Sequence, residues 1–231
     1  MSKKIIVNSI FNSLKGYKKG LKKEWIDYRI KIFMNFTLKS LKKQTNQNFL
    51  ALVQYAPETK DLIKNALSKY NKLPKNVRFV TPDEYDKEVI KNIGGHKYLY
   101  EVRLDCDDMY HKTFIEQLHN HTPKKNTQVL MCQNGYLYDS VNNRLARFPY
   151  KSSNYYANIY RVKDYLKGQR YKRTPHGHIL DKFICETTNK PNYIRHAHLK
   201  NNLTTFERYN FKKSAIINGN NKIKKILKEF F

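Results

Sequence analysis

Residues 98–108 read Tyr98-Leu99-Tyr100-Glu101-Val102-Arg103-Leu104-Asp105-Cys106-Asp107-Asp108, an apolar-leaning run that ends in three carboxylates within four positions. Carboxylates this close raise the cost of ionising one another, so a positive charge is needed nearby. A divalent cation with oxygen ligands is the simplest candidate. If the run is a strand of an α/β protein, the cluster lies at the carboxyl end of the sheet, where such proteins bind ligands.

The segments before this run alternate between strand and helix patterns. Strands are predicted at 4–10, 48–54 and 77–80, and helices at 25–43 and 61–70. Thr81-Pro82-Asp83-Glu84 is a helix-start signature, and a further helix is predicted at 113–119. This alternation predicts an α/β fold with a mostly parallel central sheet and helices on both faces.

The second half of the chain has a mixed pattern. Short strands are predicted at 128–132 and 155–162, and a hairpin with an Asn-Asn turn at 134–149. A helix is predicted at 179–185, the segment 196–205 is polar, and Asn218 to Asn221 form a break. We therefore expect one domain over 1–231, with an α/β half at 1–122, a mixed β/α half at 123–217 and a C-terminal helix at 218–231.

Composition limits the class of protein. A chain of 231 residues with 40% hydrophobic and 13% aromatic residues can form a proper core despite its low mean hydropathy of -0.78. Three cysteines without a CxxC pair indicate neither a zinc ribbon nor a disulfide framework, which suits a reducing compartment. The sequence shows no signal peptide pattern and no apolar stretch of membrane-spanning length. We expect a cytoplasmic protein, either soluble or peripheral at the inner face of the membrane.

The net charge is extreme, at +26 from 45 basic and 19 acidic residues. It predicts either a solvated lysine surface or attraction to a polyanion, which would be nucleic acid, an anionic cell-wall polymer or an acidic membrane. The tail at 222–231 adds an amphipathic pattern, because its apolar residues form one stripe and its lysines take the other face. Such a helix either lies on an anionic membrane, docks on the domain core or forms a dimer contact.

Several motifs together resemble those of the family-2-like glycosyltransferases of GT-A fold, and within them the rhamnosyltransferase group. The likeness extends over roughly residues 4 to 205. The segment 102–108 resembles the strand end "RLDaDD" of that group, and His198-Leu199-Lys200-Asn201 resembles its C-terminal HxxN element. The first helix of the group resembles the pattern Trp25-x3-Arg29-x3-Phe33 of this chain, which continues into Leu38-Lys39-Ser40-Leu41 and Gln44-Thr45. Asn48-Phe49 then leads into the second strand, as in the group. The group commonly has Arg before the first-strand Phe, where this chain has Ile10 before Phe11, and this difference leaves the donor base and sugar open.

The resemblance implies a Rossmann-like nucleotide-sugar domain, with donor binding in 1–122 and acceptor binding in 123–217. It also implies that a sugar moves from a nucleoside-diphosphate donor to an acceptor hydroxyl, with inversion. A divalent metal, Mn²⁺ or Mg²⁺, would stabilise the charge that builds on the departing diphosphate.

The metal ligands implied by the resemblance are Asp105, Asp107 and His198. In an extended segment Asp105 and Asp107 face the same side, and Asp108 is left to support them or to cap the next helix. By the likeness Asp107 binds the metal directly, and Asp105 lies nearer the ribose or the metal's waters. Imidazole suits manganese, so His198 is the third candidate ligand, with His196 as its alternative. The competing interpretation of the cluster is a solvated acidic turn that caps a helix.

Two further sets of residues complete the predicted site. Arg29 and Arg103 are candidate partners of the diphosphate, although Arg103 also has the spacing to neutralise Asp105. The segment 174–181 corresponds to the region that supplies the general base in the family, and Asp181 is our first choice and His178 our second. Asp181 is equally explained as an acid in the first turn of a helix, and His176 and His178 as phosphate-binding residues.

The acceptor is not specified by any motif. The charge favours a polyanionic or membrane-associated acceptor, such as a cell-wall polymer. A glycosyltransferase acting on modified bases of nucleic acid is one alternative, and a polyanion-binding protein without enzymatic activity is another. A metal-dependent nuclease or phosphatase is disfavoured, because the chain has a single acidic cluster and one late histidine.

Overall fold

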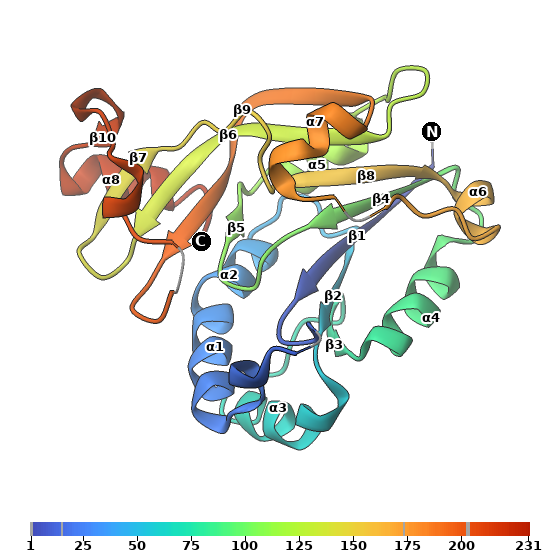
Figure 1. Ribbon diagram of the computed structural model, residues 1–231, viewed down its shortest axis with the longest axis horizontal. Coiled ribbons are helices and arrows are strands. Elements are labelled where there is room, and N and C mark those ends of the chain that lie inside the picture. The colour runs from blue at the N-terminus through green and yellow to red at the C-terminus, as the bar shows by residue number, and fades with distance from the viewer. Residues whose placement is uncertain (1, 15, 173, 202–203) are drawn as a thin grey trace.

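The computed structural model describes residues 2–14, 16–172, 174–201 and 204–231, and one curled sheet runs through both halves of the chain (Figure 1). Its first half is a parallel sheet in the order β3-β2-β1-β4, with Lys3–Ile10 as β1 and Leu50–Gln54 as β2. Strand β3 is Val77–Val80 and β4 is Tyr98–Arg103. The helices are α1 (Lys23–Asn35), α2 (Thr37–Lys42), α3 (Lys60–Leu67) and α4 (Pro82–Ile93). The predicted α/β alternation and parallel first half are confirmed.

The second half extends the same sheet. Strand β8 (Tyr156–Arg161) pairs antiparallel with β4 and with β6 (Val129–Asp139). Beyond β6 lie β7 (Arg144–Arg147) and β10 (Ile216–Ile217), while β9 (Cys185–Ala197) pairs with β6 and with β5 (Met109–Tyr110). The short helices are α5 (Phe114–Asn120), α6 (Val162–Leu166), α7 (Ile179–Lys182) and α8 (Asn220–Leu227). Single 3-10 turns lie at Lys18–Leu21, Pro57–Thr59, His176–His178, Glu207–Tyr209 and Lys213–Ala215.

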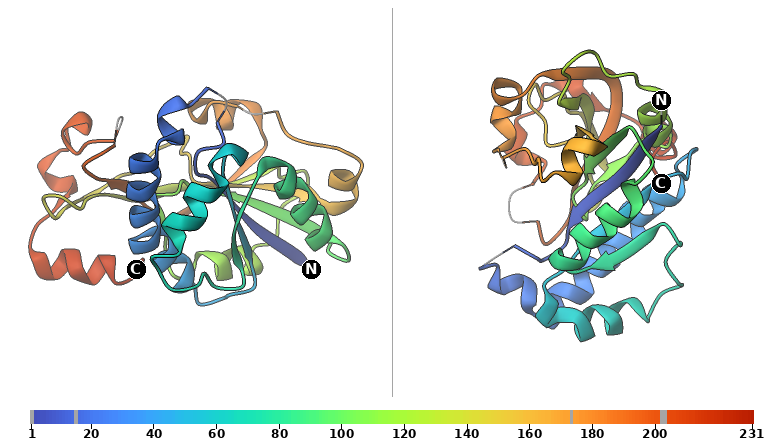
Figure 2. Two further views of the ribbon diagram at one scale, coloured as in Figure 1. Left: turned by 90° about the horizontal axis from the view of Figure 1, so that it is seen from below. Right: turned by 90° about the vertical axis from the view of Figure 1, so that its right-hand side faces the viewer.

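The two faces of the parallel sheet are covered by different helices (Figure 2). Alternate residues of β1, including Ile5 and Val7, pack with α1 and α3 in the larger core cluster. Ile6 points to the other face, where it joins the cluster formed with α4. The period-2 alternation of β1 therefore places both core faces, as expected for a central parallel strand.

Local sequence signals explain where α4 begins. The side chain of Thr81 accepts a hydrogen bond from Glu84 N–H, and the Glu84 carboxylate accepts one from Thr81 N–H at 2.7 Å. This capping box satisfies backbone donors that a helix start leaves unpaired. The helix start predicted from this signature is confirmed.

The single helix predicted at 25–43 is wrong, because the helix is interrupted at Phe36. Its backbone leaves the helical region with φ -125° and ψ -71°, and α2 starts at the next residue. The Phe36 ring lies 4.0 Å from that of His196 and 5.3 Å from that of Phe231. These contacts come from distant segments and are invisible in the local pattern.

The helix predicted at 179–185 is also wrong in extent. It ends at Lys182, and Cys185 begins the 13-residue strand β9. The sequence does not reveal this strand because it is polar and contains Pro191, which cannot donate to a ladder. The pairing of β6 with β9 shifts register beside Pro191, and Gly135 makes the close approach feasible, because a Cβ there would lie 2.4 Å from the Tyr193 ring. The predicted strand 128–132 and the first arm of the hairpin are one strand, β6, and the Asn-Asn turn has Asn143 at φ +50°.

The C-terminal helix α8 docks on the domain. Ile223 and Phe230 are buried with Met109, Tyr138 and Ile194, while Ile226, Leu227 and Phe231 pack around them. The apolar stripe therefore packs against the core, as the docking alternative predicts. Among the described residues, no helix combines the length and apolarity needed to cross a bilayer.

Candidate active site

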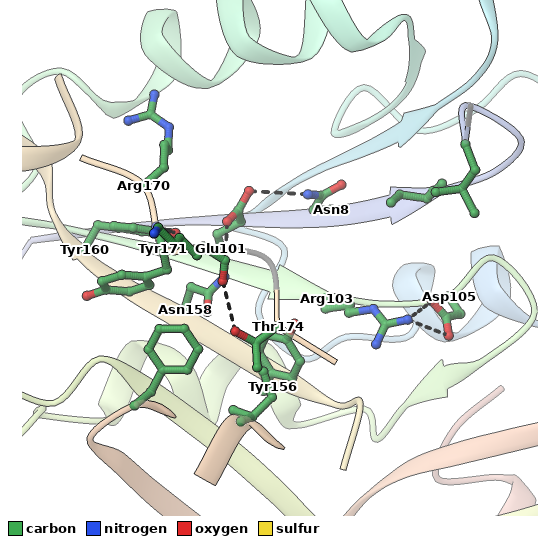
Figure 3. A pocket seen from close by; sticks show the side chains of 15 residues that line it. Asn8, Glu101, Arg103, Asp105, Tyr156, Asn158, Tyr160, Arg170, Tyr171 and Thr174 are labelled. Atoms are coloured by element: carbon green, nitrogen blue, oxygen red, sulfur yellow. Dashed lines mark hydrogen bonds and ion pairs between the residues drawn. The ribbon is translucent and has the colours of Figure 1, made fainter. Parts of the chain in front are cut away.

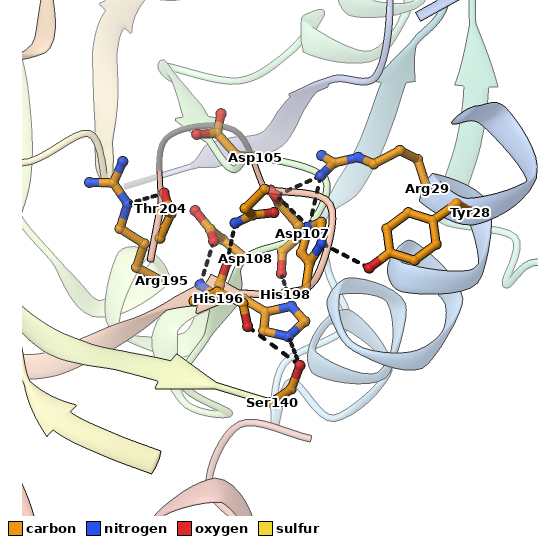
Figure 4. Close-up of polar contacts among 12 residues, drawn as sticks. Tyr28, Arg29, Asp105, Asp107, Asp108, Ser140, Arg195, His196, His198 and Thr204 are labelled. Atoms are coloured by element: carbon orange, nitrogen blue, oxygen red, sulfur yellow. Dashed lines mark hydrogen bonds and ion pairs between the residues drawn. The ribbon is translucent and has the colours of Figure 1, made fainter. Parts of the chain in front are cut away.

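The three carboxylates of the loop after β4 point in different directions (Figure 4). The prediction that Asp105 and Asp107 share one side is wrong, because the segment is not extended. The chain turns at 106–107, and Asp108 N–H donates to the Asp105 carbonyl at 3.1 Å. Each carboxylate therefore has its own set of partners.

Asp107 lies in a closed charge network with α1 and the segment after β9. Arg29 Nη1 donates to Asp107 Oδ2 at 2.7 Å, and His198 Nε2 lies 3.3 Å from the same oxygen. Burial disfavours the ionised carboxyl, but Arg29 and His198 outweigh it and hold the pKa of Asp107 well below its usual range. The structure thus brings together three predicted site residues that lie far apart in the sequence.

The His198 ring is fixed from both sides. The Tyr28 hydroxyl contacts Nδ1 at 3.1 Å, Arg29 Nη1 contacts Nε2 at 3.0 Å, and the side chain is only 2% exposed. Tyr28 directly precedes Arg29 on α1, so one helical turn supplies both contacts. Sequence reasoning missed Tyr28, although its position next to Arg29 was a usable signal.

Asp108 points inward and anchors the loop to the sheet. The Tyr155 hydroxyl donates to its Oδ2 at 2.6 Å, and His196 N–H donates to its Oδ1 at 2.9 Å. Burial, together with the negative charges of Asp107 and Asp105, raises the pKa of Asp108 well above its usual range. The predicted roles for Asp108 are thus replaced by a buried structural role, and no pattern around Tyr155 pointed to it.

His196 also belongs to this inner layer. Its Nδ1 lies 3.1 Å from the Asp107 carbonyl oxygen, and its Nε2 lies 2.8 Å from Ser140 Oγ. Burial and the neighbouring His198 lower the pKa of His196 to about 4, so the ring is neutral at pH 7. The two histidines differ in their partners, because His196 contacts a backbone carbonyl and a hydroxyl whereas His198 Nε2 contacts the Asp107 carboxylate.

Asp105 faces a cavity of about 410 Å³ (Figure 3). Its carboxylate receives Arg103 Nη2 at 3.0 and 3.3 Å and Asn154 Nδ2 at 3.4 Å. Arg103 therefore neutralises Asp105, and both side chains line the cavity. Arg195 on β9 lies near Asp105 and Asp108, and its Nε donates to Thr204 Oγ1 at 3.2 Å. The sequence did not predict Arg195 as a site residue, because strand β9 was not predicted.

The donor atoms for a metal are only partly assembled. Asp107 and His198 form a carboxylate–imidazole pair whose chemistry suits Mn²⁺, whereas Asp105 is turned to Arg103. Within the described ranges, no group of three or more His, Cys, Asp or Glu side chains converges to hold an ion. Arg29 supplies the positive charge between Asp107 and His198, and its Nε is buried without a hydrogen-bond partner. The pair fits an ion only if that ion shares or takes over the role of Arg29.

Of the two predicted bases, Asp181 lies on α7 and His178 directly precedes this helix, and both are at the surface. His178 Nδ1 and Asp181 Oδ2 are 3.4 Å apart, and their side chains are 65% and 69% exposed. His178 borders a second cavity, of about 780 Å³, which shares Tyr171 and Phe183 with the cavity at Asp105. The side chain of His176 lies outside the described part of the chain.

Comparisons with solved structures give distant similarities. Residues covering 85% of this chain match 37% of the crystal structure of S. aureus TarS, with 14% identity and a TM-score of 0.44. S. aureus TarS 1-349 in complex with UDP matches over 84% of this chain and 60% of that chain, with 12% identity and a TM-score of 0.46. A 4-diphosphocytidyl-2C-methyl-D-erythritol synthase from Anaerococcus prevotii matches over 89% and 92%, with 14% identity and a TM-score of 0.37. The chain thus spans less than two thirds of both TarS structures.

The family comparison is more direct. Among curated proteins, no sequence matches this chain significantly. The family model described as "Putative rhamnosyl transferase" matches residues 17–207, which include α1, the Asp105–Asp108 loop and the segment of His198. The expected α/β fold and the expected resemblance to this family are confirmed. The chain belongs to this rhamnosyl transferase family of glycosyltransferases.

Proposed function

We propose that this protein transfers a sugar from a nucleoside-diphosphate donor to a hydroxyl of a polyanionic acceptor, with inversion by direct displacement. The observation that carries the proposal is the loop after β4. It presents Asp105 to a cavity at the carboxyl end of the sheet and holds Asp107 beside Arg29 and His198. This is the position at which α/β folds bind phosphorylated ligands.

Two adjoining cavities suit the two ends of such a donor. The cavity at Asp105 shares Leu14 with another of about 350 Å³, which lies beyond the carboxyl ends of β1, β2 and β3. Asn12, Tyr17 and Glu58 line this cavity of about 350 Å³ and offer polar and aromatic groups to a nucleoside. A donor with its nucleoside there and its sugar deeper in the cavity at Asp105 would have its diphosphate beside Asp105.

Positive charge is available for the leaving group. Arg29 and Arg103 already neutralise Asp107 and Asp105, so each guanidinium is positioned beside the expected diphosphate. A bound Mn²⁺ or Mg²⁺ would be held by Asp107 and His198, with Asp105 nearby, and would supply Lewis-acid stabilisation of the developing phosphate charge. Asp181 and His178 remain the proposed bases, because α7 borders the cavity through Ile179.

A basic cleft favours an anionic acceptor. A cavity of about 800 Å³ is bordered by Lys18, Lys19, Lys22 and Lys200, with Trp25 and Leu199 as apolar surface. Leu199 and Lys200 directly follow His198, so the cleft adjoins the Asp107 network. Lysines around an apolar surface attract an extended anionic chain, and this contact weakens with salt.

The test is donor binding and turnover. Thermal shift with UDP-, GDP- and dTDP-linked sugars, with and without Mn²⁺, should show stabilisation by one nucleotide class. Asp107→Asn should reduce hydrolysis of that donor by at least tenfold, while Asp61→Asn, at an exposed acid on α3, leaves it unchanged. Absence of any nucleotide binding, or full activity of Asp107→Asn, would overturn the proposal. Sugar incorporation into DNA in preference to an anionic glycan would replace the acceptor with nucleic acid.

A further inference from the structure

Glu101 is a carboxylate in the middle of the central strand β4. It pairs in register with Ile6 of β1 on one side and with Asn158 of β8 on the other. Acidic residues are depleted in strands, and a half-buried carboxylate requires hydrogen-bond partners to offset its desolvation. Its presence at the centre of the sheet therefore needs an explanation.

The partners of Glu101 are neutral. The Tyr85 hydroxyl donates to Oε1 at 2.5 Å, Asn8 Nδ2 donates to Oε1 at 3.3 Å, and Asn158 Nδ2 donates to Oε2 at 3.4 Å. Among the ion pairs of the described residues, none includes Glu101. Oε2 receives one long hydrogen bond and keeps acceptor capacity for a ligand.

The amide of Asn8 is itself held in place. Gln54 Nε2 donates to Asn8 Oδ1 at 2.7 Å, and this contact turns the Asn8 amino group toward Glu101. Gln54, Asn8, Glu101 and Asn158 thus form a polar row across β2, β1, β4 and β8. A row of this kind orients the carboxylate before any ligand arrives, and pre-orientation reduces the cost of binding.

Glu101 lies in the same cavity as Asp105 (Figure 3). Alternate residues of β4 face one side, so Glu101 and Arg103 lead from the interior of the sheet toward Asp105 at its carboxyl end. Tyr156, Tyr160 and Phe183 add aromatic surface to the cavity. Its volume of about 410 Å³ falls within the range of small-molecule sites.

This combination matches the chemistry of a sugar ring. Hydroxyl groups donate to a carboxylate in charge-assisted hydrogen bonds, while the apolar face of the ring packs on aromatic side chains. We infer that the cavity holds the sugar of the donor and that Glu101 is a specificity-determining residue that accepts hydrogen bonds from its hydroxyls. The donor is favoured over the acceptor because the cavity is continuous with Asp105, where the diphosphate is expected. The inference rests on the proposed function.

The test compares nucleotides with and without their sugar. Glu101→Gln keeps an oxygen acceptor for Tyr85 but removes the charge and replaces one acceptor by a donor. Calorimetric titrations with UDP and dTDP, and with UDP-glucose, UDP-N-acetylglucosamine and dTDP-rhamnose, separate the two parts of the donor. We expect Glu101→Gln to lose about 10- to 100-fold in affinity for the preferred nucleotide sugar and to bind the nucleoside diphosphate as the wild type does.

Tyr85→Phe is the matched control. It removes the hydrogen bond to the same carboxylate, and Tyr85 lies on α4 and is not among the residues that line the cavity. A purely structural role of Glu101 predicts equal sugar affinity in both variants with lowered Tm. Wild-type sugar affinity in Glu101→Gln, an equal loss in Tyr85→Phe, or a loss seen only toward the acceptor would overturn the inference. Failure of the wild type to bind any of these nucleotides would instead refute the proposed function.

Discussion

Asp107 and Asp105, two carboxylates of the loop after β4, are neutralised in different surroundings. The Asp107 side chain is 15% exposed and is enclosed by Arg29 and His198. The Asp105 side chain is 38% exposed, shares its charge with a partly exposed Arg103, and faces a cavity. The buried network fixes the shape of the loop, while the open pair is free to exchange its partner for a ligand.

This difference separates stability from binding. Breaking a buried ion pair leaves an uncompensated charge and is costly, whereas exposed pairs contribute little to stability. We therefore expect substitutions on the Asp107 side to affect folding first, and those on the Asp105 side to affect ligand binding first.

The largest effect is expected from Asp107→Ala. Arg29 would remain buried without its counter-charge and His198 without this hydrogen-bond partner, and the free energy of unfolding should fall by about 3–5 kcal/mol. Urea titration measures this loss. The double variant Asp107→Ala/Arg29→Met should recover much of it, because both charges are then absent. A loss below about 1 kcal/mol in the single variant would contradict a closed network.

A second prediction concerns the pH dependence of stability on the inner side of the loop. Burial and His198 lower the pKa of His196 to about 4, so the unfolded chain binds a proton between about pH 4 and 6.5 that the folded protein excludes. Stability should therefore rise with pH across this window, by roughly 3 kcal/mol from this residue at most. Urea titrations at pH 4.5, 5.5 and 6.5 should show a shallower rise in His196→Gln, and parallel curves would contradict the assignment.

The sequence predicts the first half of the fold well, because buried strands and amphipathic helices carry strong periodic signals. Four strands, the capping box at Thr81 and the position of the Asp cluster follow from neighbours within a few residues. Strand β9 does not, because its polar residues and Pro191 resemble a loop until β6 and β5 are placed beside it. Its absence from the prediction also hides Arg195.

The candidate site is predictable in composition but not in arrangement. Asp107, Arg29 and His198 were each identified, yet their pairing spans 78 and 91 positions and depends on the completed fold. A turn at 106–107 gives Asp105 and Asp107 different partners, and no residue pattern in the sequence predicts this turn. Glu101 lies within an apolar run of the sequence, and its place in the cavity becomes visible only in the folded structure.

Arg29→Gln tests whether the buried network competes with a metal. The substitution removes the positive charge between Asp107 and His198 while keeping a polar side chain of similar reach. Mn²⁺ affinity without nucleotide should rise about tenfold, because a like charge within a few ångströms of the ion is gone. Electron paramagnetic resonance of free Mn²⁺ measures it. Arg29→Lys keeps the charge and should leave the affinity low, and equal affinities in all three proteins would show that no ion binds at this pair.

The smallest effect on stability is expected from Asp105→Asn, on the open side. The partner pair with Arg103 is partly exposed, so the free energy of unfolding should change by less than about 1 kcal/mol. The affinity for a nucleotide sugar should nevertheless change, because Arg103 loses its counter-charge next to the expected diphosphate. Urea titration and calorimetry on the same sample give both numbers. If Asp105→Asn destabilises the fold as much as Asp107→Ala does, both carboxylates contribute to folding stability, and the cavity-facing carboxylate is a structural group.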